Sequence, residues 1–348
     1  MGKMTNTTLF SLIHDFFKIY LPNERKFSAH TIRAYQKALE LLLDFVKLQK
    51  NVRLSNITFE MIDRKMLTDF LEYLELDRGC SVATRNHRLN CIRAFYGYVA
   101  KIEITAVKYW EEIKKVDTAI VSKKPIGHMS EKAVETILSQ PNTTTRKGLR
   151  DMFLMLLLYQ TGARIQELLD IRLCDIHFGS TPSILLHGKW SKIRSVPIRE
   201  KTTEHLKSYI DIFHPTENMF SEQTLFYVNR NNTKKRMTED NARHLIRKYG
   251  EKARIKCSEV PFGVHPHLFR HSIAMHLYQN GVELALVSQW LGHAQLETTL
   301  IYAHADTELK RKAIAAAMPE NGPLNEHINS ERYKIDDEEL LKLLCGLK

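Results

Sequence analysis

The sequence has few cysteines and no pattern that would pair them. Its five cysteines are an odd number and contain no Cys-x-x-Cys spacing, which indicates reduced thiols in a cytosolic protein. Long apolar runs are also missing, because "MFLMLLLY" (152–159) is much too short to cross a bilayer. No signal peptide opens the chain. We therefore expect a soluble, cytoplasmic protein.

Acidic residues are in short supply as well. The chain has 51 Lys and Arg against 40 Asp and Glu, a net charge of +11. The excess is uneven, because residues 319–348 carry 4 basic and 7 acidic side chains and the preceding 318 residues carry 47 and 33. A basic body with an acidic tail favours a polyanionic partner, foremost nucleic acid, and hence association with the nucleoid. An unspecialised basic surface is the alternative.

Helical periodicity dominates residues 1–116. A length of 348 residues suits two domains, and this first one predicts a bundle of four or five helices. Ser28 and Ser81 suit the N-caps of two of them. The apolar stripes that follow these serines are Ile32, Tyr35, Leu39, Leu42 and Val46, and Val82, Leu89, Ile92, Tyr96 and Val99. The arginines that fall off the second stripe are Arg85, Arg88 and Arg93. We expect this basic face to bind DNA, with simple solvation as the alternative.

A change of pattern separates the two domains. Residues 117–128 are charged, contain proline and glycine and show no helical period, so we interpret them as the interdomain linker. Residues 129–318 return to helices, with N-caps expected at Ser130 and Thr238. The sequence therefore predicts a mainly α protein, in which a mostly helical, mixed α/β domain with a small antiparallel sheet follows the helical bundle.

The sheet is predicted from a change to a two-residue period. "SILLHGKWSKIRSVPI" (183–198) predicts two strands around a tight basic turn, and Pro197 marks its strand as an edge strand. A third strand is expected in 224–229. A turn that carries Lys189, Lys192 and Arg194 could reach into a DNA groove, although a solvated basic turn is the alternative.

Further polar patches follow the same order along the chain. Arg164 and Glu167 share a helix face just after "TG", where a carboxylate can orient a guanidinium, although most such pairs are plain surface ion pairs. In "HPHLFRH" (265–271), His267, Arg270 and His271 share another helix face. A zinc site is disfavoured there, because a cationic arginine lies between the two histidines and no HExxH pattern is present.

The last patch is "WLGHAQLETTLIYAHA" (290–305). Gly292 can end a helix in the left-handed conformation, His293 follows it, and Tyr302 lies on the next helix. A tyrosine in such a place is usually a core residue. Each patch is weak by itself, and their order along the chain carries the information.

The order Arg, Lys, His-x-x-Arg, His, Tyr resembles the tyrosine recombinase (phage integrase) family. "TGARIQELLDIRLCDI", "HPHLFRHSIAMHL" and "LGHAQLETTLIYAHA" are similar to its motifs, and the helical region before them is similar to its core-binding domain. The 26 residues from His267 to His293 and the 9 from His293 to Tyr302 are the spacings of bacterial, Xer-like and transposon members. Two residues depart from the pattern. Phe269 implies only a packing change, and Trp190 after the hairpin lysine leaves Lys189, which we favour, and Lys192 as alternatives.

The resemblance implies a chemistry for these residues. Tyr302 would form a covalent 3′-phosphotyrosyl link to DNA, so that strands are cut and rejoined with no metal, ATP or other cofactor. Arg164 and Arg270 would clamp the phosphate. The remaining roles are His267 as proton acceptor, Lys189 as donor to the 5′ oxygen, His293 as a phosphate ligand or a guide for Tyr302, Glu167 as the residue that orients Arg164, and Lys192 and Arg194 as DNA contacts.

The resemblance also implies partners. They are double-stranded recombination sites and further copies of the chain, as a tetramer on two duplexes. In the tail, residues 319–334 are expected to form a connector and "DDEELLKLLCGL" a helix that docks on a neighbouring protomer, with docking on its own domain as the alternative. A type IB topoisomerase-like relaxase and a catalytically inactive DNA-binding regulator are the rival functions. Transposition, phage integration and chromosome-dimer resolution stay open.

Overall fold

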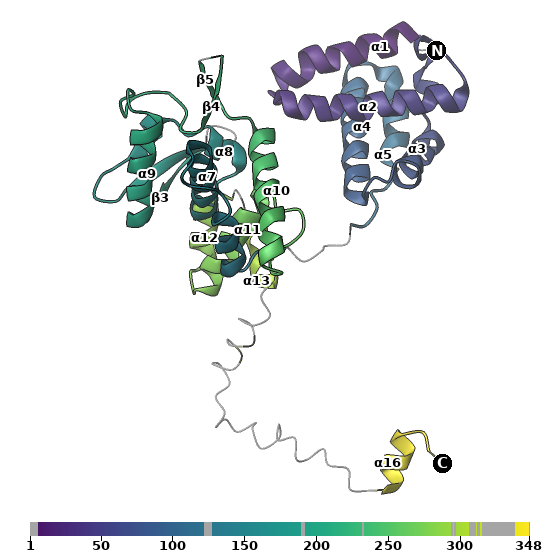
Figure 1. Cartoon of the computed structure of the whole chain (residues 1–348). Helices are drawn as coiled ribbons and strands as arrows, with labels where there is room; N and C mark the ends of the chain where they lie inside the picture. Colours follow the sequence, from purple (N-terminus) through teal and green to yellow (C-terminus); the bar gives the residue numbers. More distant parts are fainter. Residues whose placement is uncertain are drawn as a thin grey trace. The chain divides into compact units, whose positions relative to one another are not determined.

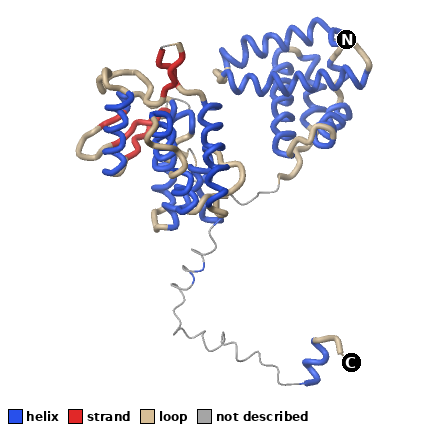
Figure 2. Tube along the Cα trace, in the orientation of Figure 1, coloured by secondary structure: helices blue, strands red, loops and turns tan. Residues whose placement is uncertain are grey.

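The computed structural model of the chain describes residues 6–121, 127–188, 192–231, 233–293, 295, 297–305, 311, 314 and 338–347. The chain divides into two compact units, Met1–Lys124 and Pro125–Lys348. Figure 1 shows both units, and Figure 2 shows that helices dominate each of them while the drawn strands belong to the second.

The first unit is built from helices and short helical turns. In chain order they are α1 (Asn6–Asp15), the π-helix η1 (Phe16–Glu24), α2 (Ala29–Lys50), the 3-10 turns η2 (Leu54–Asn56) and η3 (Phe59–Met61), α3 (Arg64–Leu76), α4 (Val82–Ile102), the turn η4 (Ile104–Ala106) and α5 (Val107–Lys114).

Both predicted caps of this unit are confirmed. The hydroxyl of Ser28 accepts a hydrogen bond from the N–H of Thr31, and that of Ser81 accepts one from the N–H of Thr84, each at 3.3 Å. Each bond satisfies one of the N–H groups that a helix start leaves without a partner. The predicted stripes face the core, whose fully buried members include Leu42, Val46, Leu89, Ile92, Tyr96 and Val99.

The second unit combines helices with two small sheets. In chain order its elements are α6 (Glu131–Leu138), α7 (Arg146–Thr161), α8 (Ile165–Leu169), the turn η5 (Leu173–Asp175), β1 (Ile176–His177), β2 (Ser183–His187), β3 (Ile193–Pro197), α9 (Glu200–Phe213), β4 (Tyr227–Arg230), β5 (Thr233–Arg236), α10 (Glu239–Lys256), α11 (Pro266–Gln279), α12 (Leu284–Leu291), α13 (Glu297–Ala305) and α16 (Glu338–Leu344).

The two sheets are antiparallel and separate. The first has the order β1-β2-β3, so β3 with its Pro197 is an edge strand, as predicted. The third strand of this sheet is β1 and does not come from 224–229. The strand in that region, β4, pairs with β5 in a hairpin whose turn begins at Asn231, a residue in the left-handed conformation. This local pairing is available because the turn returns the chain at once.

The core of the second unit surrounds α7 and α11, which pack against each other. It includes Phe153 and Phe269, whose side chains are buried at 1% and 0% exposure. Phe269 is therefore a core residue. The predicted caps Ser130 and Thr238 accept N–H bonds from Ala133 and Asn241. None of the helices in the described ranges combines the length and the apolar character needed to span a membrane.

The described part of the tail is α16 with the residues that follow it. Its leucines are exposed, from 43% for Leu340 to 76% for Leu343. The predicted connector 319–334, Asp336 and Asp337 lie outside the described residues.

Candidate active site

Two helix ends with glycine in the left-handed conformation frame the site. Helix α7 ends at Gly162 with φ 57°, and α12 ends at Gly292 with φ 66°. A Cβ on Gly162 would lie 2.9 Å from the side chain of Leu291, so the two ends are in contact. Glycine is needed here for both its conformation and its size. The turns bring Arg164 and His293, which follow them, to the same place.

Arg270 connects these two turns through hydrogen bonds to a carbonyl of each. Its side chain extends from α11 and is 4% exposed. Its Nη1 donates to the carbonyl of Gly162 at 2.6 Å, and its Nη2 donates to the carbonyl of Leu291 at 2.7 Å. Burial and then the charges of Arg164 and Arg194 lower the pKa of Arg270 to about 10. It therefore stays cationic at neutral pH, in a place with little solvent to screen its charge.

Arg164 lies at the N-cap of α8 and faces outward. Its side chain is 40% exposed, and its Nη1 donates to Oε1 of Glu167 at 2.8 Å. Glu167 also accepts the backbone N–H of Arg164 at 2.9 Å. Burial opposes the charge of Glu167, but Arg194 and Arg164 outweigh this effect and lower its pKa. The predicted orienting role of Glu167 therefore has a geometric basis, and Arg164, the more exposed of its two arginine partners, presents positive charge to an incoming anion.

Histidines line the same region in the neutral form. Burial lowers the pKa of His267, helped by His265 and Arg270. Burial and the charges of Arg270, Arg164 and Arg194 lower the pKa of His293 to about 4. Nδ1 of His293 lies 2.7 Å from the hydroxyl of Thr299, which is fully buried on α13. His293 therefore connects the end of α12 to the helix that carries Tyr302.

Tyr302 is in contact with a histidine that the sequence did not single out for catalysis. Its hydroxyl lies 2.9 Å from Nδ1 of His271, and the residue is 1% exposed. Burial raises the pKa of Tyr302, against the influence of Arg270, and burial lowers that of His271 to about 4. Sequence reasoning named His267 as the proton acceptor, whereas the structure pairs the phenol with His271. The available signal was the four-residue spacing on α11, which places both histidines on one face.

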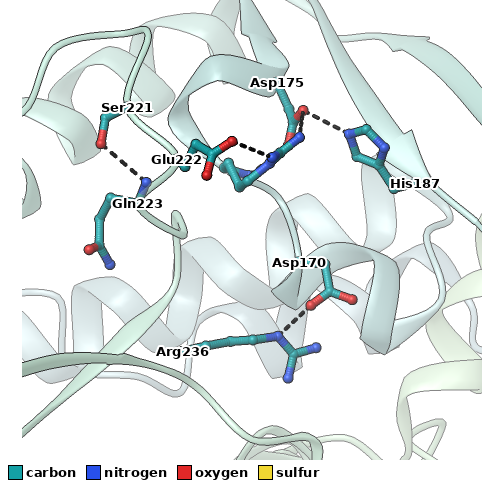
Figure 3. Close-up of polar contacts among 8 residues, drawn as sticks. Asp170, Asp175, His187, Ser221, Glu222, Gln223 and Arg236 are labelled. Carbon is teal, nitrogen blue, oxygen red and sulfur yellow. Dashed lines mark hydrogen bonds and ion pairs between the residues drawn. The ribbon is translucent and has the colours of Figure 1, made fainter.

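The strands of the basic hairpin are anchored, while its tip lies beyond the described residues. Lys189 and Trp190 are outside the described part of the chain, and Lys192 is exposed. At the end of β2, Nε2 of His187 lies 2.7 Å from Oδ1 of Asp175, whose other partner is Arg172. Figure 3 shows this contact, and beside it the ion pair of Arg236 with Asp170. Burial acts to raise the pKa of Asp175, but the hydrogen bonds from Arg172 and His187 have the larger combined effect and lower it.

Arg194 does not extend from the hairpin into solvent. Its side chain is 14% exposed and its Nη2 donates to Oε2 of Glu167 at 2.8 Å. Its Nε donates to the carbonyl of Trp290 at 3.0 Å. The residue predicted to contact DNA therefore lies among the site residues.

The three arginines of α4 also have partners inside their own unit. Arg85 forms an ion pair with Glu75 at 2.8 Å. Arg93 donates to the carbonyl of Lys114, the last residue of α5, and to that of Val116, which follows α5. Nη1 of Arg88 lies 3.1 Å from the sulfur of Cys80. The prediction of a DNA-binding face here thus rests on side chains that the fold already uses.

The site contains groups for acid, base and anion chemistry. Within the described ranges, no cluster of three or more His, Cys, Asp or Glu residues has an arrangement that would hold a metal ion. The described residues bring together two arginines that could bind an anion, neutral histidines that could exchange protons, and a buried phenol.

The chain is similar to known proteins along nearly its whole length. Residues 128–308 match the phage integrase family and residues 9–116 match the phage integrase SAM-like domain. The chain is 30% identical over 347 residues to y4rC of Sinorhizobium fredii, named an integrase/recombinase, a match covering 98% of this chain and 99% of that protein. It is 30% identical over 302 residues to the tyrosine recombinase XerD of Staphylococcus saprophyticus, a match covering 87% of this chain and 96% of the relative.

Solved structures share the fold. The XerH site-specific recombinase bound to a palindromic difH substrate, a post-cleavage complex, matches with a TM-score of 0.64 and 23% identity over 84% of this chain and 81% of that chain. The Tn1549 transposon integrase in complex with transposon right end DNA matches with a TM-score of 0.66 and 15% identity over 90% of this chain and 99% of that chain.

Proposed function

The chain belongs to the phage integrase family and is a tyrosine site-specific recombinase, and from this premise we propose that Tyr302 is the nucleophile that cuts and rejoins DNA. Its phenolic oxygen attacks the scissile phosphorus, a 3′-phosphotyrosyl bond forms, and the bond to the 5′ oxygen breaks. Because the phosphodiester bond between two nucleotides is replaced by a phosphodiester bond to tyrosine, its energy is kept and rejoining needs no ATP.

Arg164 and Arg270 bind the phosphate oxygens in this proposal. Arg270 keeps its charge although it is 4% exposed, and Glu167 fixes Arg164 through two hydrogen bonds. Donors that are held in place before the reaction stabilise the charge that develops in the transition state. A phosphate between these guanidiniums also offsets their mutual repulsion.

The protons of the reaction move through neutral side chains. With its pKa near 4, His271 is neutral at pH 7 and its Nδ1 is 2.9 Å from the phenol. We assign it a share in accepting the proton of Tyr302, beside His267. Lys189 donates a proton to the leaving 5′ oxygen, and Lys192 is the alternative. His293 binds a phosphate oxygen or guides Tyr302, to which Thr299 connects it.

The burial of Tyr302 supports a resting state before cleavage. At 1% exposure its phenol is out of reach of a duplex. In this proposal α13 shifts when a DNA phosphate binds Arg164 and Arg270, because the phosphate gives the phenol a new partner in place of His271. Cleavage is therefore coupled to correct binding.

The roles proposed for the domains are based on the two family matches. We propose that 1–116 is the core DNA-binding domain, 117–128 the linker and 129–318 the catalytic domain, and that the tail 319–348 docks on a neighbouring protomer. Of the solved structures that share the fold, that of XerH holds a palindromic difH substrate and that of Tn1549 integrase holds transposon right end DNA. For this chain we propose double-stranded recombination sites as substrate, a tetramer on two duplexes as the active assembly, and the cytoplasm, at the nucleoid, as its location.

The observation that carries the proposal is the meeting of Arg164, Arg270, His293 and Tyr302, from four separate helix ends and faces, in one site where the charges of Arg270 and Arg164 help to lower the pKa of His293. The test is incubation with a duplex that carries its recombination site and a nick beside the scissile phosphate. A covalent protein–DNA adduct with a free 5′-hydroxyl supports the proposal, and its absence contradicts it. Strand exchange between two sites separates a recombinase from a relaxase, which would only relax supercoils.

A further inference from the structure

Arg194 lies where three parts of the site meet. It is on β3, opposite Leu186 of β2. The strand alternates, because Ile193 and Ser195 are exposed while Val196 is fully buried and Arg194 is largely so. Side chains two residues apart share a face of a sheet, so the side chain of Arg194 points inward with that of Val196.

The guanidinium of Arg194 is committed to two acceptors on different elements. Nη2 binds Oε2 of Glu167 on α8 at 2.8 Å, and Nε binds the carbonyl of Trp290 near the end of α12 at 3.0 Å. The side chain is 14% exposed. Two of its nitrogens are therefore held by acceptors that belong to α8 and α12.

Glu167 is shared between Arg194 and Arg164. Its Oε1 accepts from Nη1 of Arg164 at 2.8 Å, while Oε2 accepts from both the N–H of Arg164 and Nη2 of Arg194. Among the groups that keep Glu167 ionised, Arg194 has the largest effect. Without Arg194 the carboxylate would be buried with one cationic partner fewer, and its hold on Arg164 would weaken.

The other contact acts on the turn before His293. A Cβ on Gly292 would lie 2.9 Å from Cδ of Arg194 and 3.1 Å from its Nη1. The turn is therefore packed against the arginine, and the residue after it is His293. The bond to Trp290 fixes the last turn of α12 from the same side.

We propose that Arg194 is a positioning residue for strand cleavage, which sets Arg164 through Glu167 and His293 through the Trp290–Gly292 turn, and is not a DNA contact. This inference rests on the proposed function.

The experiment compares Arg194→Lys and Arg194→Met with Ser195→Ala, a control on the opposite, exposed face of β3. Affinity for a single-site duplex is measured at several salt concentrations, and the rate of adduct formation is measured at saturating protein on the nicked substrate. A positioning role predicts unchanged affinity and salt dependence with an adduct rate lower by at least about tenfold for Arg194→Met. Arg194→Lys, which retains the charge but not both bonds, falls in between, and Ser195→Ala behaves as wild type.

A DNA contact predicts the reverse. The slope of log affinity against log salt would then fall by about 1 for Arg194→Met while the saturated rate stays intact, and this result overturns the inference. Glu167→Gln supplies a further arm. If Arg194 acts through Glu167, the double variant is no slower than the slower single variant, whereas multiplied losses contradict that route.

A merely structural role is separated by two readouts. Thermal unfolding shows whether each variant is folded at the assay temperature, and Arg194→Lys keeps the test decisive if Arg194→Met does not fold. A substrate with sulfur at the bridging 5′ position should leave the defect unchanged, because the positioning of Arg164 and His293 in the transition state is affected and leaving-group protonation is not. Wild-type protein tests the proposed function. If it forms no adduct, both the proposed function and the inference on Arg194 are overturned, whereas an adduct from wild-type protein leaves the variants to test the inference alone.

Discussion

The hydroxyl of Tyr302 lies 2.9 Å from Nδ1 of His271, and this contact is made in the interior of the second unit. Burial raises the pKa of the phenol and lowers that of the imidazole to about 4, so both groups are neutral near pH 7. A neutral pair is the form that a buried site favours. The contact therefore holds the phenol, which we propose as the nucleophile, beside a neutral imidazole without ionising it.

The pair should make the stability of the protein depend on pH. The folded pKa of His271, about 4, is below the ordinary histidine value of about 6.5, so the unfolded chain takes up a proton between these values and the folded chain does not. The contribution of the neutral His271 to the free energy of unfolding is thus fully present above about pH 6.5 and is lost as the pH falls toward 4. Replacing His271 with Asn should make the decline in unfolding free energy from pH 7.5 to 5 shallower by about 1–2 kcal/mol. Urea unfolding at both pH values measures it. The exposed His177→Asn is the control, and an equal slope in His271→Asn would count against the assignment.

Lys189 and Lys192 can be told apart by the leaving group. If Lys189 protonates the 5′ oxygen, Lys189→Ala slows cleavage, and a substrate with sulfur at that bridging position restores it because the thiolate leaves without a proton. Cleavage rates on oxygen and sulfur substrates are compared for both alanine variants. Rescue of Lys192→Ala alone would transfer the role to Lys192.

Arg93 should matter for the stability of the first unit. Arg93→Met removes the bonds to the carbonyls of Lys114 and Val116, and the unfolding free energy should fall by about 1–3 kcal/mol. The salt dependence of DNA binding should stay as in wild type. Lys101→Met, an exposed change on the same helix, is the control. A lower salt slope with intact stability would restore Arg93 as a DNA contact.

Removal of the tail should separate binding from assembly. The leucines of α16 are exposed, and burial of one leucine contributes about 1.5–3 kcal/mol, so this helix gains by docking elsewhere. Truncation after Met318 is expected to leave single-site binding nearly intact and to weaken paired-site complexes. Native gel shift and the size of the complexes on DNA report both. Paired-site assembly at wild-type concentrations by the truncated chain would refute docking on a neighbouring protomer.

Local features of the fold were predictable, and contacts between distant segments were not. Ser28, Ser81, Ser130 and Thr238 cap helices because a cap depends on a hydroxyl and an N–H three residues away. A strand in 224–229 could be expected, and β4 (Tyr227–Arg230) begins there, but its partner β5 could not, since pairing depends on where the chain returns.

The site shows the same limit. The order and spacing of the motif residues can be recognised in the sequence itself; these residues are Arg164, His267, His293 and Tyr302. Whether Arg194 points to solvent or inward depends on which face of β3 is covered, and a basic turn gives no sign of it. Arg85, Arg88 and Arg93 fall off an apolar stripe, which predicts exposure, yet Arg93 binds a segment 21–23 residues further on.

The most direct test of the central claim is to find the residue that is linked to DNA. The adduct from the nicked substrate is digested with nuclease and protease, and the peptide that carries the phosphate is identified by mass spectrometry. We predict the phosphate on Tyr302, with no adduct from Tyr302→Phe, which should still bind the duplex. A phosphate on another residue, or an adduct that persists in Tyr302→Phe, would contradict the account.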